Sequence, residues 1–305
     1  MSGQSLEMFA SRVEEHVRAI LGDGYETEIR TVTKNNGVIL TGISICSTGD
    51  RVSPVIYLDD YYTERADIEV SAEETAYKIV NCYHSNGKIP STIWKSMEGL
   101  DNFEQIKDRV MFKLVHTKNN VQRLKQVPSI SFLDLSIVFY LYMDEDSGGM
   151  MVAQIQNEHL ALWETDVQVL YNVALQNMQR VMPAEIKGMN EIIHNLRCAY
   201  GEKMEEDEGE SPFYVLSTVS GINGAACMLY PGVMSGFAEQ RGKDIIILPS
   251  SVHEVLLLED TGEMDCVALM ELVKYINATE VPTEDVLSEK VYEYSLEKKE
   301  IRIVA

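Results

Sequence analysis

The chain has 305 residues, with 48 acidic and 26 basic side chains and a formal net charge of −22 at pH 7. A surface this negative repels phosphate backbones and anionic lipid headgroups, which argues against direct binding of nucleic acid or of a membrane surface. An apolar fraction of 45% is ordinary for a folded protein and excludes global disorder.

The first elements are predicted to be a helix and a hairpin. Apolar side chains recur at spacings of three and four over residues 5–21, which is typical of an amphipathic helix. Two strands, 25–33 and 38–46, follow it. They flank Asn35-Asn36-Gly37, which supplies the left-handed turn residues that a hairpin needs.

Start signals predict the next two helices. A short apolar strand, 54–58, comes first, and Ser71 with Glu74 then matches a capping box that opens a helix. Asp101 with Glu104 opens a short second helix, and residues 110–115 read as a strand after it.

The middle of the chain is predicted to continue with a hairpin and two helices. Residues 130–143 are rich in β-branched and aromatic side chains, so they form a strand or a deeply buried segment. The turn at residues 144–149 lets residues 150–156 pair with the preceding strand as a hairpin. Helices follow at 164–180 and 186–199.

Residues 201–210 are highly charged and almost free of apolar side chains, which marks a linker or loop. The fold is therefore predicted to be α+β, with mainly antiparallel sheets, packed helices and two lobes, 1–200 and 211–305. In the second lobe we expect strands at 213–216, 225–229, 244–248, 253–258, 291–294 and 301–304, with helices at 230–242 and 264–277.

Cysteine usage and hydropathy favour a cytoplasmic protein. The five cysteines are odd in number and widely spaced, without a CxxC pair, so neither a disulfide framework nor a zinc site is expected. The N-terminus shows no signal peptide, and the 14-residue apolar run 130–143 is too short to span a membrane.

The strongest candidate for chemistry lies between the predicted strands 244–248 and 253–258. Ser250, Ser251 and His253 sit on this connection with Glu254, and a hydroxyl beside an imidazole could support nucleophilic or general-base catalysis. Alternation along a strand places His253 and Glu254 on opposite faces. The competing interpretation is structural: the serines close a turn and His253 bonds to backbone.

Three other carboxylates are candidate binding groups. Asp134 lies within an apolar run, where a buried unpaired carboxylate would cost several kcal/mol, so a polar partner or an exposed strand face is expected. Asp59 and Asp60 are flanked by three tyrosines and could bind a cation or a sugar. The alternative is an amphipathic strand end whose phenols bridge core and water.

Known catalytic and metal-binding motifs are missing. Gly242-Lys243 lacks the spacing and the hydroxyl of a phosphate loop, and Ser235 lacks the spacing of a nucleophile elbow. The acidic turn near Asp144 has Ile155 where a calcium loop needs Glu. No metal site and no cofactor are predicted.

Four segments carry a resemblance to a known family. They are Pro54–Asp60, Val127–Leu135, Tyr230–Val233 and Ile247–Val255. Together they resemble an uncharacterised family from anaerobic, gut-type Firmicutes that is catalogued only as a domain of unknown function. The resemblance implies a bacterial, intracellular protein, and it implies no activity, cofactor or catalytic residue.

Three functions are compatible with the sequence. The favoured one is a non-enzymatic binding or regulatory protein with a basic protein partner, because the last 105 residues alone hold 21 acidic and 8 basic side chains. The second is a hydrolase or transferase that uses His253 with Ser250 or Ser251. The third is an acidic mimic that inhibits a nucleic-acid-binding protein.

Overall fold

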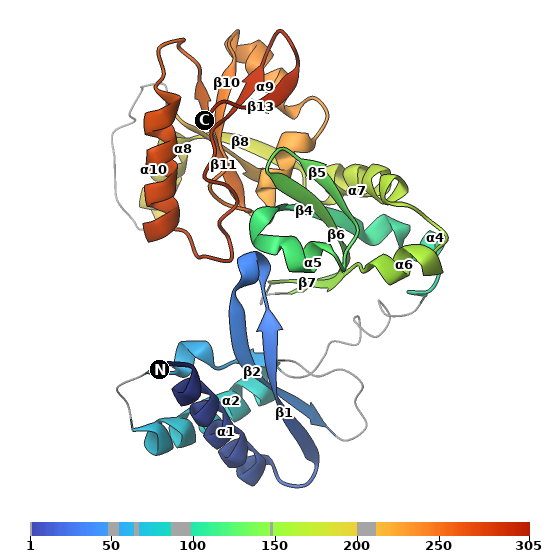
Figure 1. Ribbon diagram of the computed structural model, residues 1–305, viewed down its shortest axis with the longest axis vertical. Coiled ribbons are helices and arrows are strands. Elements are labelled where there is room, and N and C mark those ends of the chain that lie inside the picture. The colour runs from blue at the N-terminus through green and yellow to red at the C-terminus, as the bar shows by residue number, and fades with distance from the viewer. Residues whose placement is uncertain (1, 48–54, 64–66, 87–98, 147–148, 200–211) are drawn as a thin grey trace. The chain divides into compact units, whose positions relative to one another are not determined.

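A computed structural model describes residues 2–47, 55–63, 67–86, 99–146, 149–199 and 212–305. The chain divides into two compact units, Met1–Glu98 and Gly99–Ala305, which are described separately (Figure 1). Both combine helices with antiparallel sheets, so the predicted α+β class is confirmed.

This division differs from the predicted lobes 1–200 and 211–305. Strand β8 (Ala184–Gly188) pairs with β9 (Tyr214–Thr218), so the chain before and after the predicted linker belongs to one sheet. The linker, 201–210, lies outside the described residues. A run of charge in a sequence therefore does not mark a domain boundary when the flanking segments are strand partners.

The Met1–Glu98 unit packs two helices with a three-stranded antiparallel sheet of order β1-β2-β3. Asn36 and Gly37 both have positive φ in the β1–β2 turn, as the predicted hairpin requires. Its elements are α1 (Ser2–Leu21), β1 (Tyr25–Thr33), η1 (Asn35–Gly37), β2 (Ile39–Ser47), β3 (Val55–Tyr57), η2 (Asp59–Tyr61) and α2 (Ile68–Asn86).

The core of this unit follows from the helical periodicity. Phe9, Val13 and Val17 of α1 lie on one helix face and are buried with Ile43 and Ile45 of β2. Ala76, Ile79 and Val80 of α2 are buried in the same cluster. The helix begins earlier than expected, because the Asp67 carboxylate accepts from the backbone N–H of Glu69 at 3.0 Å; the predicted cap, Ser71, lies inside the helix.

The Gly99–Ala305 unit begins with a four-stranded antiparallel sheet in which β6 pairs with β4, β5 and β7. Helix α7 packs along β4, where the rings of Phe112 and Tyr171 lie 5.8 Å apart. Its elements are α4 (Phe103–Ile106), η3 (Lys107–Arg109), β4 (Val110–His116), η4 (Lys118–Asn120), α5 (Val121–Leu124), β5 (Ser129–Phe132), β6 (Leu135–Asp146), β7 (Gly149–Gln154), α6 (Asn157–Leu162) and α7 (Val167–Val181).

A six-stranded antiparallel sheet of order β13-β12-β10-β11-β9-β8 completes this unit. The remaining elements are α8 (Met189–Ala199), η5 (Gly224–Leu229), α9 (Val233–Arg241), β10 (Ile245–Leu248), β11 (Glu254–Glu259), α10 (Cys266–Thr279), β12 (Tyr292–Ser295) and β13 (Glu300–Ile303).

Strand β10 is apolar along its whole length because both faces of the sheet are covered there. Ile246 and Leu248 pack with Val273 of α10. Helix α10 lies alongside the sheet that contains β10 (Figure 1). Ile245 and Ile247 face the other way and join the main core, which also contains the buried residues of β4 and β6. The uninterrupted apolar sequence of β10 is therefore explained by burial on both faces of the sheet.

Three predicted elements differ from the observed ones. The run 130–143 is divided between β5 and β6 by a turn in which Leu133 has a φ of 54°. Residues 225–229 are a 3-10 helix, η5, because periodicity cannot distinguish a short buried helix from a strand. The start of the predicted helix 186–199 belongs to strand β8, and α8 begins at Met189.

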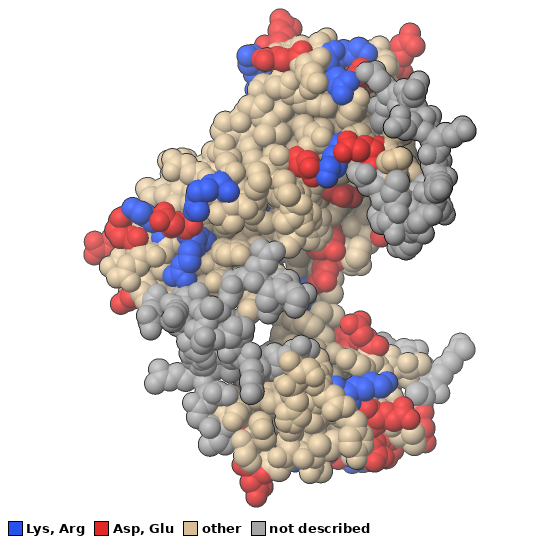
Figure 2. All heavy atoms as spheres, turned by 180° about the vertical axis from the view of Figure 1, so that it is seen from behind, with Lys and Arg blue, Asp and Glu red and all other residues tan. Residues whose placement is uncertain are grey.

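Charge is spread over both units. On the face seen in Figure 2, acidic side chains lie mostly around the edges, with Lys and Arg interspersed among them. No dense array of carboxylates covers the described part of this face. Across the described residues, none of the helices combines the length and the apolar character that crossing a membrane requires.

Candidate binding site

The predicted serine–histidine connection folds as a tight link between β10 and β11. His253 N donates to Ser251 Oγ at 3.1 Å, and Ser217 Oγ donates to the His253 carbonyl at 2.7 Å. Ser250 accepts at its carbonyl from the Leu287 N–H at 2.9 Å. The Ser251 hydroxyl and the Ser250 carbonyl group thus both take part in hydrogen bonds to the backbone of neighbouring residues.

The His253 ring is held from both sides. Its Nδ1 accepts from the backbone N–H of Asn223 at 3.4 Å, and its Nε2 lies 3.2 Å from Asp285 Oδ1. An Nδ1 that accepts requires the proton on Nε2, where it is donated to the carboxylate. The contacts bring His253 to Asp285 rather than to Ser250 or Ser251, and a nucleophilic role for these serines stays a prediction.

Asp134 receives two buried hydroxyl groups. Tyr292 donates to Asp134 Oδ1, and Ser288 donates to Oδ2 at 2.7 Å. His116 Nε2 lies 3.9 Å from the same carboxylate. Asp134 belongs to the β5–β6 turn and Tyr292 to β12, so this cluster connects the two sheets and gives the Asp134 carboxylate polar partners.

The buried Tyr292 hydroxyl should make the Gly99–Ala305 unit less stable at alkaline pH. Burial, followed by the hydrogen bond to Asp134, raises the pKa of Tyr292 above its ordinary value. The unfolded chain therefore loses this proton near pH 10 while the folded chain keeps it, so the stabilisation is complete below about pH 10 and is lost as pH rises further. Above that pH, unfolding free energy should fall by about 1.4 kcal/mol per pH unit more in the wild type than in Tyr292→Phe, measured by urea denaturation at a series of pH values. Equal slopes of unfolding free energy against pH in the two proteins would contradict this prediction.

The remaining sequence candidates have contacts or exposure of their own. Asp59 Oδ2 accepts from the Thr41 N–H at 2.8 Å and so closes the turn after β3. Tyr62 packs against Phe9, with ring centroids 5.5 Å apart. Asp60 is exposed on η2, and Glu254 is exposed at the start of β11.

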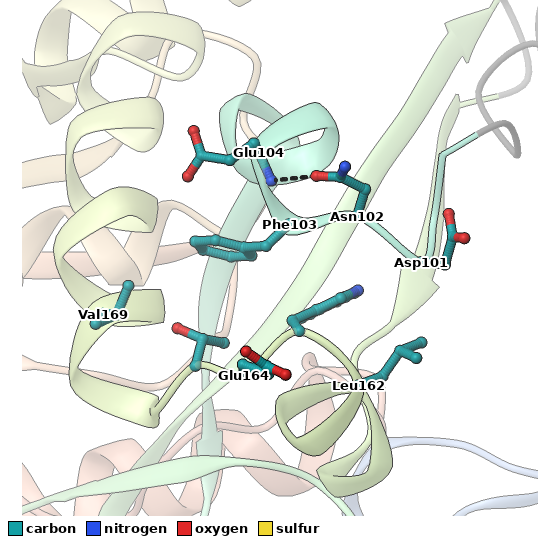
Figure 3. A pocket seen from close by; sticks show the side chains of 9 residues that line it. Asp101, Asn102, Phe103, Glu104, Leu162, Glu164 and Val169 are labelled. Atoms are coloured by element: carbon teal, nitrogen blue, oxygen red, sulfur yellow. Dashed lines mark hydrogen bonds between the residues drawn. The ribbon is translucent and has the colours of Figure 1, made fainter.

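A pocket that the sequence did not predict lies between α4 and the connection from α6 to α7. Its volume is about 460 Å³. Figure 3 shows the Phe103 ring between the side chains of Glu104 and Glu164, with Asp101 farther away beyond Asn102. We call it the acidic-aromatic pocket, and its lining residues are Asp101, Asn102, Phe103, Glu104, Leu162, Trp163, Glu164, Thr165 and Val169.

Local structure fixes the aromatic part of this pocket. Trp163 Nε1 donates to the Leu100 carbonyl at 2.8 Å, and the indole stacks on His159 with centroids 5.1 Å apart. Phe103 lies 5.9 Å from Trp163, centroid to centroid. Asn102 caps α4 by accepting from the Glu104 N–H at 3.0 Å, where the sequence had placed the start signal at Asp101 (Figure 3).

The carboxylates of the pocket differ in their surroundings. Glu104 pairs with Lys107 at 2.6 Å, an exposed i,i+3 contact. For Asp101 and Glu164, no cationic partner lies within the described part of the chain. Glu164 follows α6 with a φ of 49°, a left-handed conformation that costs a non-glycine residue about 1 kcal/mol. A glutamate where glycine is easier points to a use for its side chain.

Metal binding finds no support in the described residues, among which no group of three or more His, Cys, Asp or Glu side chains could hold an ion. The acidic-aromatic pocket left only a faint signal in the sequence, since its two halves are some 60 residues apart, as the 63-residue separation of Leu100 and Trp163 shows.

Comparison with known proteins yields one match. Residues 6–296 fit the model of a protein family described as a family of unknown function, DUF5688. Neither the curated proteins nor the solved structures provide a match.

Proposed function

Since this chain belongs to the DUF5688 family of unknown function, we propose its role from its own chemistry: it is a protein-binding module whose acidic-aromatic pocket takes a Lys or Arg side chain of a basic partner. The observation that carries the proposal is the lining, which combines three carboxylates and two aromatic rings and contains no lysine or arginine. A cation is attracted both by carboxylates and by the face of an aromatic ring.

The shape of a basic side chain suits the rest of the lining. Lys and Arg carry an apolar stem below the charged group, and such stems cover apolar surface while the charge stays near water. Val169 offers that surface on the Phe103 side of the pocket, and Leu162 offers it on the other side (Figure 3). The net charge of −22 adds long-range attraction, which raises the association rate of a basic partner and makes it sensitive to salt.

The test is a titration of the full chain with octalysine and octaarginine peptides. Trp163 fluorescence reports binding when Trp94 is replaced by phenylalanine. Removing two exposed charge pairs is worth about 1 kcal/mol, so the double variant Asp101→Asn/Glu164→Gln should bind about fivefold more weakly. Binding should also weaken steadily with added salt.

A matched control separates the pocket from the general acidity of the surface. The double variant Glu263→Gln/Glu280→Gln removes the same charge at exposed positions beside α10. Its affinity should stay within twofold of the wild type. Equal losses in the two double variants would show that the peptides bind by net charge alone, and the proposal would be abandoned.

Glu164→Gly provides an independent arm of the same test. Glycine suits the left-handed backbone, so the variant should be at least as stable as the wild type and still bind the peptides more weakly. A cytoplasmic location and a bacterial source stay predictions, as do the hydrolase and nucleic-acid-mimic alternatives. For the hydrolase, the occupied nitrogens of His253 give less support than the acidic-aromatic pocket gives to binding.

A further inference from the structure

The Gly99–Ala305 unit holds one of its own arginines against two aromatic rings and a carboxylate. Arg241 of α9 lies 4.4 Å from the ring centroid of Tyr214 and 5.5 Å from that of Phe237. These two rings meet edge to face with centroids 5.1 Å apart. Arg241 Nη1 lies 3.7 Å from Glu259 Oε1, so the guanidinium group is paired within the chain. We call these four residues the Arg241 cluster.

The acidic-aromatic pocket combines the same kinds of groups without an arginine of the chain. The rings of Phe103 and Trp163 are in contact, with centroids 5.9 Å apart, and Asp101 and Glu164 line the same pocket. These two carboxylates have no cationic partner within the residues that the structure describes. Trp163 is buried and Phe103 is partly exposed, so Phe103 is the more accessible ring. The pocket can therefore give an arginine from outside the contacts that Arg241 has inside the fold.

Arginine suits this combination of groups better than lysine does. A guanidinium group stacks with its face on a ring, and the N–H donors in its plane stay able to bond carboxylates. The lysine ammonium group is a compact and strongly hydrated point charge, which loses more hydration on contact with a ring. In this chain Lys34 Nζ lies 4.4 Å from the centroid of a single ring, that of Tyr57. We propose that the acidic-aromatic pocket selects arginine over lysine, which rests on the proposed function and names the side chain that the basic partner presents.

The position of Phe103 indicates which carboxylate the arginine contacts. Figure 3 shows the Phe103 ring between the side chains of Glu104 and Glu164. Glu104 already pairs with Lys107 at 2.6 Å. Glu164 is therefore the carboxylate that remains for a guanidinium group stacked on Phe103.

The experiment compares octaarginine with octalysine, two peptides of equal charge, by calorimetric titration of the full chain. The wild type should bind octaarginine about fivefold more tightly than octalysine. Phe103→Leu removes the ring and keeps the carboxylates, so the ratio of the two affinities should fall below about twofold. Phe103→Tyr keeps an aromatic ring and should keep the wild-type ratio.

A second variant tests the same ratio if Phe103→Leu does not fold. Asp101→Asn/Glu164→Gln changes exposed side chains only, and it too should bring the ratio below about twofold, because the guanidinium group loses its carboxylates. The matched control Glu263→Gln/Glu280→Gln should keep the wild-type ratio.

Failure of this inference is distinguishable from failure of the proposed function. If neither peptide binds, or if the two double variants lose equal affinity, the pocket is not the binding site and both proposals are rejected. If the peptides bind at the pocket with affinities within about twofold of each other, only the selection of arginine is overturned. The same holds if a folded Phe103→Leu variant keeps the wild-type ratio.

Discussion

Gly224→Ala should lower the unfolding free energy of the Gly99–Ala305 unit by about 3 kcal/mol. A Cβ on Gly224 would clash with Ser217 Oγ and with the His253 carbonyl oxygen, and it would lie 2.6 Å from Ser217 Cα. Two of these atoms are the donor and acceptor of the 2.7 Å hydrogen bond that fastens the β10–β11 connection to β9. Overpacking costs about 1–3 kcal/mol, and the broken hydrogen bond adds about 1 kcal/mol.

Urea denaturation followed by Trp163 fluorescence, in the Trp94→Phe background, measures this loss. Gly236→Ala is the control, since it adds the same methyl group where no atom lies within 4 Å. That variant should be stabilised by about 0.5–1 kcal/mol, because alanine is the better helix former. If Gly224→Ala changed the urea midpoint by no more than the control does, the close approach of backbone at Gly224 would be refuted.

Asp134→Ala is the second substitution with a large expected effect, a loss of about 3 kcal/mol in unfolding free energy. It leaves the hydroxyl groups of Tyr292 and Ser288 without their acceptor, and both residues are almost fully buried. A hydrogen bond to a charged group contributes about 1.5–3 kcal/mol, and an unsatisfied buried donor incurs the full cost of desolvation.

A double-mutant cycle with Tyr292→Phe separates this network from a role of Asp134 in the β5–β6 turn. If the hydroxyl–carboxylate bond carries the effect, the two losses should fall short of additivity by at least 1 kcal/mol. Additivity within about 0.5 kcal/mol would assign the loss to the turn instead. Urea denaturation at pH 7 suffices, because Tyr292 keeps its proton there.

Elements with a strong local signal are predictable from the sequence. The periodicity of α1 and the Asn35-Asn36-Gly37 turn depend on neighbouring residues only, and both hold in the structure. The run 130–143 is misleading because Leu133 adopts a left-handed turn conformation without a glycine, asparagine or proline to announce it. Tertiary contacts through Asp134 hold that turn, and local sequence does not encode them.

The candidate sites are predictable only in part, for the same reason. Asp134 is recognisable as a carboxylate in need of partners, but Ser288 and Tyr292 lie 154 and 158 residues further along the chain. The sequence indicates His253 as a residue with specific contacts, while Asp285 could not be named in advance. The lining of the acidic-aromatic pocket combines residues from distant segments, so this pocket cannot be found from spacing.

The pairing of β8 with β9 has one more consequence. Gly188 is the register partner of Tyr214, so the chain leaves the sheet at one rung of the ladder and returns at the same rung. The entropic cost of closing a loop depends only weakly on loop length. The residues between Gly188 and Tyr214 can therefore be exchanged or shortened without changing the register of β8 and β9.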